Sequence, residues 1–281
     1  MNNSNKQDKR SISEHPKRNF FLPAQIISVF AKGGEEHLNR SGRAKLLLAV
    51  NAGAFMAFGA TFSILLAIGI QIDSLEYLLS GFGFATGYVM VFLSGAILFT
   101  EVNVLLPTYY LQYPYWLQTR FLRFWGLTYI GNMAGAFLTA LIIWNSSSLP
   151  SSFVPQLNDF LDNKMMFMQD GVRGWFKVLL SGVIANWLIG MASFFTIAAR
   201  DIIGKIVGTF LPVTLFVAGN FQHSAANMGY FSLGLLMNQE YTWDQYLFLN
   251  LLPASIGNII GGGILIALLF SYAFEDELPK K

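Results

Sequence analysis

The sequence predicts an all-α integral membrane protein with six transmembrane helices in an inverted 3+3 repeat, in which the second and fifth helices are interrupted. Composition supports this fold class first. Apolar residues make up 54% of the 281 residues and charged residues only 12%, so a water-soluble globule would lack the polar surface to cover itself. Six long apolar stretches, and a motif that occurs once in each half, are the other two observations.

The apolar stretches place the expected helices along the chain. They cover residues 46–70, 77–106, 121–144, 175–200, 205–237 and 247–273. Each reaches the roughly 20 residues that cross a bilayer as a helix, and the second and fifth are long enough that we expect broken helices. The predicted division is a cytoplasmic N-terminal tail over 1–45, a transmembrane channel domain over 46–273 and a cytoplasmic C-terminal tail over 274–281.

The basic residues predict which ends face the cytoplasm. Nine of the 18 Lys and Arg residues lie in the first 45 residues, and six more lie after the second stretch, between the fourth and fifth, and at the C-terminus. The connections after the first and fifth stretches hold none, so the positive-inside rule places both termini in the cytoplasm. Three crossings per half then force the two halves into opposite orientations. The polar N-terminus has no apolar core of a signal peptide.

The duplicated motif lies deep inside the second and fifth stretches. Its first copy reads GAILFTEVN over 95–103 and its second reads GNFQHSAAN over 219–227, an alignment that pairs Phe99 with His223. Polar and glycine residues at matching depths of two halves are typical of a transport pathway, because interrupted helices are tolerated in a membrane only where they line a cavity.

A second repeated pattern occurs after the motif in each half. A Gly-Asn pair occurs at 131–132 and again at 257–258, with a further glycine at 135 and at 261. Small residues at such spacing allow membrane helices to approach closely. We expect these glycines to serve helix packing rather than direct contact with a solute.

The polar residues of the motif are the candidates for chemistry. His223 lies in the middle of the fifth stretch, where a titratable side chain is costly to bury and marks a functional site by default. Ser224 and Asn227 follow it, and Thr100 and Asn103 occupy the first copy. These hydroxyls and amides can line a pathway for a polar solute, or they can satisfy the backbone groups that a helix break sets free. Both roles stay open.

The rest of the sequence offers no metal-binding or catalytic cluster. The chain has no Cys, and the other two histidines, His15 and His37, lie in the polar N-terminal region, so His223 has no partner for a metal site. We therefore expect no metal, no cofactor and no nucleic-acid partner. One histidine without paired carboxylates gives little apparatus for a membrane-embedded enzyme.

Five segments spread over nearly the whole membrane region carry a family resemblance. They are GFGFATGYVMVFLSGAILFT (81–100), GNMAGAF (131–137), GVIANWLIG (182–190), LPVTLFVAGNFQHSAANM (211–228) and NLLPASIGNIIGGG (250–263). In these segments, and in their order, the chain resembles the formate/nitrite transporter family. The His-Ser-x-x-Asn-Met core at 223–228 is the most specific match.

The resemblance implies a fold, an assembly and a solute class. The protomer would be aquaporin-like, in a homopentamer with one pore per protomer, in the lipid bilayer of the bacterial cytoplasmic membrane. The solutes would be small monovalent weak-acid anions such as formate, nitrite, hydrosulfide, acetate or lactate. The resemblance assigns the pathway to the central histidine His223, to Thr100, Ser224 and Asn227 beside it, to Leu98 and Phe99 in the loop of the second span, and to apolar constrictions at Phe84, Ile189 and Phe216.

Physical chemistry suggests how an anion could pass dry constrictions. Desolvating an unpaired carboxylate costs many kcal/mol, and an apolar environment raises the pKa of a carboxylic acid. A proton taken up from water, or exchanged with His223, would let the neutral acid cross. We therefore expect transport that is either proton-linked or passive.

The chain departs from the family pattern at several positions. Ile97 and Gln222 stand where the family has glutamates. Glu101, an added carboxylate, either replaces one of them or faces the cytoplasmic mouth. The family lysine expected about sixteen residues before Asn186 falls instead on Asp170. Two outcomes stay open: Lys164, Arg173 or Lys177 supplies the attracting charge, or the charge is lost and anion capture is weaker, so that the solute differs from formate.

Two other functions remain open on the sequence. A pore for a small neutral solute is favoured by the missing lysine. A non-conducting membrane scaffold or sensor would be favoured if Phe99 and Tyr88 blocked the pathway.

Overall fold

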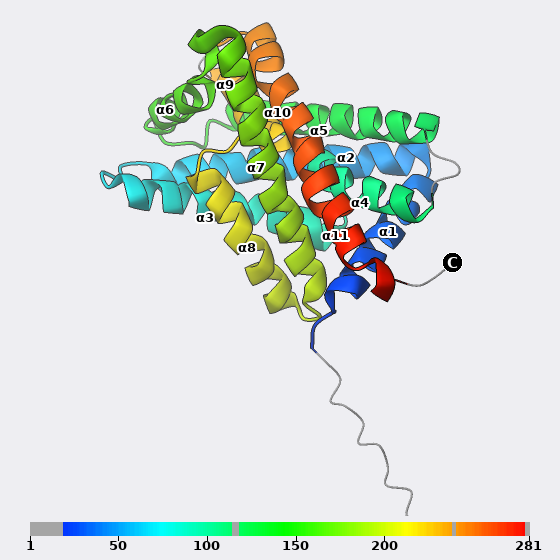
Figure 1. The fold of residues 1–281 in the computed structure, drawn as a ribbon. Coiled ribbons are helices and arrows are strands. Elements are labelled where there is room, and N and C mark those ends of the chain that lie inside the picture. Colours follow the sequence, from blue (N-terminus) through cyan, green and yellow to red (C-terminus); the bar gives the residue numbers. More distant parts are fainter. Residues whose placement is uncertain (1–18, 114–117, 238–239, 279–281) are drawn as a thin grey trace, which may run out of the picture.

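The structure, a computed structural model, describes residues 19–113, 118–237 and 240–278, and these form helices joined by short connections (Figure 1). The helices are α1 (Pro23–Asn39), α2 (Gly42–Ala67), α3 (Asp73–Ser94), α4 (Phe99–Gln112), α5 (Gln118–Ser146), α6 (Phe153–Met165), α7 (Gly171–Ala198), α8 (Ile202–Ala218), α9 (Ser224–Met237), and a continuous run of η2 (Gln245–Leu251), α10 (Leu252–Ile260), η3 (Gly261–Leu268) and α11 (Leu269–Ala273). Two short 3₁₀ turns, η1 (Met168–Asp170) and η4 (Glu275–Glu277), complete the described elements.

The two interrupted helices are confirmed. The second crossing ends as α3 at Ser94 and resumes as α4 at Phe99, and the fifth ends as α8 at Ala218 and resumes as α9 at Ser224. Within the described residues, five helices are long and apolar enough to cross a membrane, and α8 is a shorter apolar helix. The fifth crossing therefore needs both α8 and α9. Each of the six predicted stretches overlaps one crossing, with its ends displaced by a few residues.

The two halves run in opposite directions. The backbone N–H of Phe21, just before α1, donates to the carbonyl of Ala198 at the end of α7, and α1 leads directly into the start of α2. The corresponding helices α2 and α7 therefore begin on opposite faces. Figure 1 shows α2, α3 and α5 crossing α7, α8 and α10 at a steep angle.

Glycines make the same close packing in each half. A Cβ on Gly135 of α5 would collide with the carbonyl oxygen of Val50 of α2, and a Cβ on Gly261 would collide with the carbonyl oxygen of Val183 of α7. The third helix of each half thus lies directly on the backbone of the first. These contacts bear out the packing role expected for the glycines.

Helix α1 is packed against the membrane domain, although it lies in the segment predicted as an N-terminal tail. Its residues Ile26, Ile27 and Phe30 are buried in one cluster with Phe194 of α7 and Ile266 of η3. Lys32 and Glu35 of α1 and residues 275–276 line one hollow of about 550 Å³. Both described ends of the chain therefore lie on the α1 face.

The packing of α1 is expected to weaken in acid. Burial, Arg40 and Lys45 lower the pKa of His37 from 6.5 to about 4. A lowered pKa means that unfolded α1 binds the proton more tightly, so stability is complete above pH 6.5 and is lost as the pH falls towards 4. Hydrogen exchange should show α1 opening roughly 30-fold more often at pH 5 than at pH 7.5.

The control for this prediction removes the titrating ring. In His37→Gln the pH dependence of α1 exchange should disappear, after correction for intrinsic exchange rates. An unchanged pH response in that variant would assign the effect to another group.

Candidate functional site

One asparagine holds the first helix break. Asn132 of α5 accepts a hydrogen bond from the backbone N–H of Phe99 at 2.8 Å and donates to the carbonyls of Ile97 at 3.0 Å and Ala49 at 2.8 Å. Its side chain is fully buried. A helix that ends at membrane depth leaves backbone groups that no water can satisfy, and one side chain from a neighbouring helix satisfies them here.

A second asparagine holds the second break in the same way. Asn258 of α10 accepts from the backbone N–H of Ser224 at 2.8 Å and donates to the carbonyls of Gln222 at 3.1 Å and Gly182 at 2.8 Å. The hydroxyl of Ser224 also donates to this asparagine at 2.9 Å. We call Asn132 and Asn258 the clamp asparagines. The sequence indicated them only as the asparagines of the repeated Gly-Asn pairs.

The clamps correct the alignment of the two halves by one residue. They pair Phe99 with Ser224, the first residue of α4 with the first of α9. The predicted pairing of Phe99 with His223 is therefore wrong, and Leu98 is the counterpart of His223. The physical reason is loop length: residues 95–98 form the first break and 219–223 the second. Asn220, with a positive φ of 51°, lies in the longer loop.

Both ring nitrogens of His223 have protein partners. The backbone N–H of Ala226 donates to Nδ1 at 3.1 Å, and the hydroxyl oxygen of Tyr88 lies 2.8 Å from Nε2 and 3.4 Å from Nδ1. His223 and Tyr88 are fully buried. The last residue before α9 is thereby joined to the middle of α3.

Aromatic rings surround this pair. The ring of Phe216 lies 5.3 Å from that of His223 and meets Phe84 edge-on at 5.8 Å, and Phe84 lies 5.9 Å from Tyr88. None of these rings is more than 1% exposed, so no water-sized opening reaches His223. Ile189 of α7 is buried in the same cluster. The structure thus brings together His223 and the predicted constriction residues.

One predicted pathway residue lies elsewhere. Phe99 packs against α5, with its ring 4.9 Å from Tyr129 and 6.4 Å from Trp125. Leu98 precedes the first turn of α4 and is buried in the same cluster as Phe84, Ile189 and Phe216. Neither has a ring or hydrogen-bond contact with His223 among the described residues.

A neutral amide network lies beside the second break. Oε1 of Gln222 accepts from Asn227 at 2.8 Å and from Asn250 at 3.1 Å, and Asn227 also donates to Asn250 at 2.7 Å. Oδ1 of Asn227 is buried and has no hydrogen-bond partner in the described part of the chain. Asn250 was missed in the sequence because no counterpart of it occurs in the duplicated motif.

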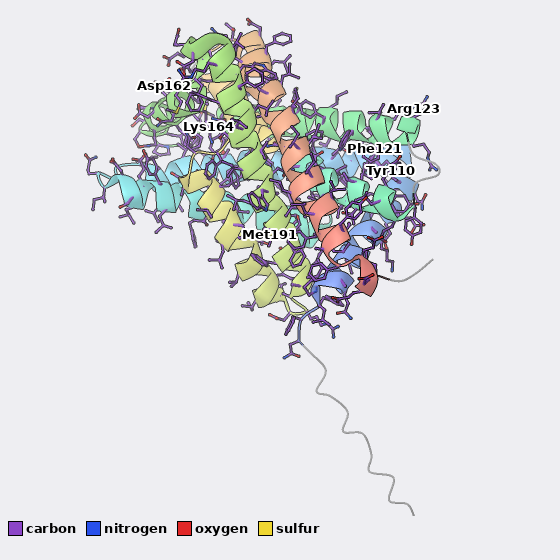
Figure 2. All side chains as sticks on the ribbon, in the orientation of Figure 1. Tyr110, Phe121, Arg123, Asp162, Lys164 and Met191 are labelled. Carbon is purple, nitrogen blue, oxygen red and sulfur yellow. The ribbon has the colours of Figure 1, made fainter. Side chains whose placement is uncertain are left out.

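Lys164 is the basic residue that reaches this network. Its ammonium donates to the carbonyl of Phe221 at 3.1 Å and lies 5.4 Å from the ring centre of Phe160, and the residue is 2% exposed. Within the described residues it has no carboxylate partner. Of the three predicted candidates, Lys177 pairs instead with Asp170. Figure 2 shows Lys164 on α6, away from α1.

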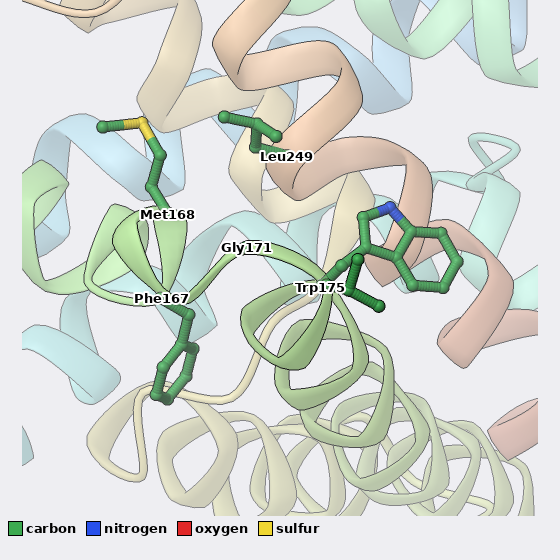
Figure 3. Close-up of a pocket in the computed structure, with 6 residues that line it drawn as sticks. Phe167, Met168, Gly171, Trp175 and Leu249 are labelled. Carbon is green, nitrogen blue, oxygen red and sulfur yellow. The ribbon is translucent and has the colours of Figure 1, made fainter.

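Two hollows lie near this face. One of about 620 Å³ is lined by Asn163, Lys177, Ser181 and Phe221 among others, so it adjoins the second break. A smaller one of about 340 Å³ is lined by apolar residues and Gly171 (Figure 3), and no titratable residue lines it. Only the larger hollow is placed to admit a polar solute.

Buried polar atoms also gather near the start of α4. Oγ1 of Thr100, both side-chain polar atoms of Asn103 and Oδ1 of Asn186 have no protein hydrogen-bond partner among the residues described. Asn186 donates to the carbonyls of Thr100 at 3.2 Å and Asn258 at 2.6 Å. Glu101 is half-buried in the first turn of α4. Unpartnered buried groups are costly and usually meet water or a ligand.

The described residues contain no cluster of three or more His, Cys, Asp or Glu side chains that could hold a metal ion. The chemistry available is therefore hydrogen bonding, aromatic packing and one buried ammonium. Such a set can bind and orient a small polar solute.

Comparison with known proteins gives consistent matches. A family model described as "Formate/nitrite transporter" matches residues 24–272. The chain is 29% identical over 251 residues to a "Probable formate transporter" of Methanothermobacter thermautotrophicus, covering 83% of this chain and 89% of that protein. It is 26% identical over 277 residues to "Formate channel FocA" of Escherichia coli (strain K12), covering 91% and 95%.

Two solved structures share the fold. One, titled "FNT family ion channel", has a TM-score of 0.76 at 21% identity and covers 89% of this chain and 98% of that one. The other, titled "Pentameric formate channel with formate bound", has a TM-score of 0.69 at 21% identity and covers 83% and 98%. This similarity supports the all-α membrane fold.

Proposed function

Because this chain belongs to the formate/nitrite transporter family, we propose that it conducts formate or a similar small monovalent weak acid through a pathway centred on His223. The observation that carries the proposal is the position of His223. It lies beside the second of two clamped helix breaks, enclosed by the rings of Phe84 and Phe216. Unpartnered polar atoms lie at Thr100 and Asn227.

The geometry supports passage of the neutral acid. An anion inside a ring of buried aromatic side chains loses its hydration shell, which costs many kcal/mol if its charge stays unpaired. Lys164, buried without a carboxylate partner, would draw the anion to the approach beside Phe221. A proton taken up there removes most of the desolvation cost. The neutral acid then crosses the rings while buried hydroxyls and amides replace its hydrogen bonds to water.

Gln222 makes the amide network electrically neutral. The family resemblance places a glutamate at this position, and a glutamine keeps the acceptor oxygen without the charge. Its Oε1 retains two amide donors, Asn227 and Asn250. Within the described residues Lys164 has no carboxylate partner that would compete with an anionic solute.

The assembly and its orientation belong to the same proposal. We infer a homopentamer in a bacterial cytoplasmic membrane with both termini in the cytoplasm. A solved structure of similar fold is titled as pentameric, and the protomer exposes many large apolar side chains such as Leu122, Ile142 and Leu211. Both described ends lie on the α1 face, and the basic residues Lys32, Arg40 and Arg200 lie in or beside α1. The relatives are named channels and transporters, which supports a role without catalysis.

Solute flux in proteoliposomes tests the function. Stopped-flow light scattering and a trapped pH dye would follow formate, nitrite, acetate, lactate, hydrosulfide and glycerol from pH 5 to 8. We expect weak-acid flux above that of empty vesicles, rising up to tenfold per pH unit as the pH falls, because the protonated fraction rises by that factor above the acid's pKa. Glycerol should not enter.

Two outcomes would overturn the proposal. Glycerol entry without weak-acid flux would assign a pore for neutral solutes. Flux equal to that of empty vesicles for all six solutes, from correctly assembled protein, would assign a non-conducting membrane protein.

A further inference from the structure

Tyr88 is a buried polar residue at the constriction that the expected pathway did not include. Its ring meets those of His223 edge-on at 5.7 Å, Phe216 at 6.1 Å and Phe92 at 5.6 Å. It lies one helical turn beyond Phe84 on α3. Its hydroxyl is 2.8 Å from Nε2 of His223, and the residue has no exposed surface.

The hydrogen bonds of His223 decide where its proton lies. A backbone N–H can only donate, so Nδ1, which receives the N–H of Ala226 at 3.1 Å, must present a lone pair. The neutral imidazole therefore carries its proton on Nε2. That N–H points at the hydroxyl oxygen of Tyr88. This assignment follows from the network of donors and acceptors.

The hydroxyl proton of Tyr88 is the donor that the hydrogen bonds of His223 do not use. Both nitrogens of His223 are committed to protein groups, so the imidazole has no N–H to offer a solute. The hydroxyl of Tyr88 accepts from Nε2 and keeps its own proton to donate. The side chain of Thr100 lies within hydrogen-bonding reach of Tyr88, with Glu101 nearby. A solute would therefore take the tyrosine proton in competition with Oγ1 of Thr100, which has no other hydrogen-bond partner among the described residues.

We propose that Tyr88 is the specificity-determining hydrogen-bond donor of this pathway, with Thr100 as its second hydroxyl, and that His223 acts through it as a positioning residue. The inference deepens the proposed function and rests on it. The solute class is a small oxyanion or its acid, whose oxygen accepts from the tyrosine hydroxyl. Hydrosulfide fits this site less well, because sulfur is a weak acceptor.

Tyr88→Phe tests the proposal with the smallest possible change. The variant keeps the aromatic ring in the constriction and removes only the hydroxyl. Formate and acetate flux in proteoliposomes should fall about tenfold, the loss expected for one hydrogen bond of about 1 to 1.5 kcal/mol, whereas hydrosulfide flux should change less than twofold. Unchanged formate flux, or an equal rise for every solute as from an opened gate, would overturn the proposal.

Tyr230→Phe is the matched control. Tyr230 is also buried, its hydroxyl donates to Ser63 at 2.9 Å, and its ring stacks on Phe84 at 5.3 Å. It has no hydrogen bond to His223. Its variant should conduct formate at the rate of the unaltered protein. If Tyr230→Phe lost as much flux as Tyr88→Phe, the loss would be attributed to altered packing and not to a hydrogen bond with the solute.

A second measurement does not depend on flux. The chain has three histidines, so His15→Gln/His37→Gln leaves His223 as the single imidazole for ¹⁵N NMR of the intact, detergent-solubilised protein. We expect the Nε2–H tautomer at neutral pH, and we expect it to persist in Tyr88→Phe because Ala226 fixes Nδ1. An Nδ1–H tautomer would overturn the assignment even if weak acids are transported. The tautomer would stand if flux failed for every solute.

Discussion

Replacing Asn258 by leucine is expected to remove most of the folded protein. The substitution keeps the side-chain volume and strips partners from the N–H of Ser224 and the carbonyls of Gln222 and Gly182. Gly182 lies within α7, so its carbonyl keeps its helical partner. The two groups left unsatisfied, at about 1 to 3 kcal/mol each, cost a large part of the ~5 to 15 kcal/mol that holds a typical protein folded. Size-exclusion chromatography of detergent extracts should lose its monodisperse peak.

Asn145→Leu is the control for this prediction. Asn145 lies exposed near the end of α5 and donates to the carbonyl of Leu141 on its own helix. Its variant should elute as the unaltered protein does. If Asn258→Leu eluted in the same way, the clamp would be dispensable and the break would be held by other contacts.

His223→Ala is expected to fold and to lose most weak-acid flux. The substitution frees the N–H of Ala226 and deprives Tyr88 of the group that orients its hydroxyl. A buried polar group left without its partner costs about 1 to 3 kcal/mol, which corresponds to roughly a 5- to 150-fold loss of formate flux. Initial rates at pH 6, from vesicles with equal amounts of assembled protein, provide the measurement.

His37→Ala separates this effect from the loss of any histidine. His37 lies on α1, with its ring 6.3 Å from that of Phe124 and no contact to the constriction. Formate flux in this variant should stay within twofold of the unaltered protein. Equal flux in His223→Ala and His37→Ala would contradict a central role for His223.

The fold could be predicted from the sequence because hydrophobic length and duplication each report on it directly. Stretches too long for one straight crossing indicated the breaks in the second and fifth helices. The residue-by-residue pairing of the two halves could not be predicted. The motif glycines Gly95 and Gly219 are separated by one residue fewer than the helix starts Phe99 and Ser224. A one-residue difference in loop length is invisible until the clamp asparagines fix both ends.

The candidate site was predictable only in part. Titratable and hydroxylic residues at membrane depth indicated His223 and Thr100. Counting residues back from Asn186 gave Asp170, although the buried ammonium belongs to Lys164 of α6. From the sequence Tyr88 was considered only as a residue that could block the pathway. A role for its hydroxyl became apparent from its position 2.8 Å from Nε2 of His223. Such partners come from elements far apart in the chain.

The clamp asparagines also bear on how the protein is made. Asn132 bonds only to groups between Ala49 and Phe99, so the first break can close as soon as α5 leaves the translocation machinery. The second break waits only for Asn258. Each half therefore contains all the hydrogen-bond partners of its own clamp asparagine. Two separately synthesised halves, divided between α5 and α6, would each enter the lipid with its own break already sealed.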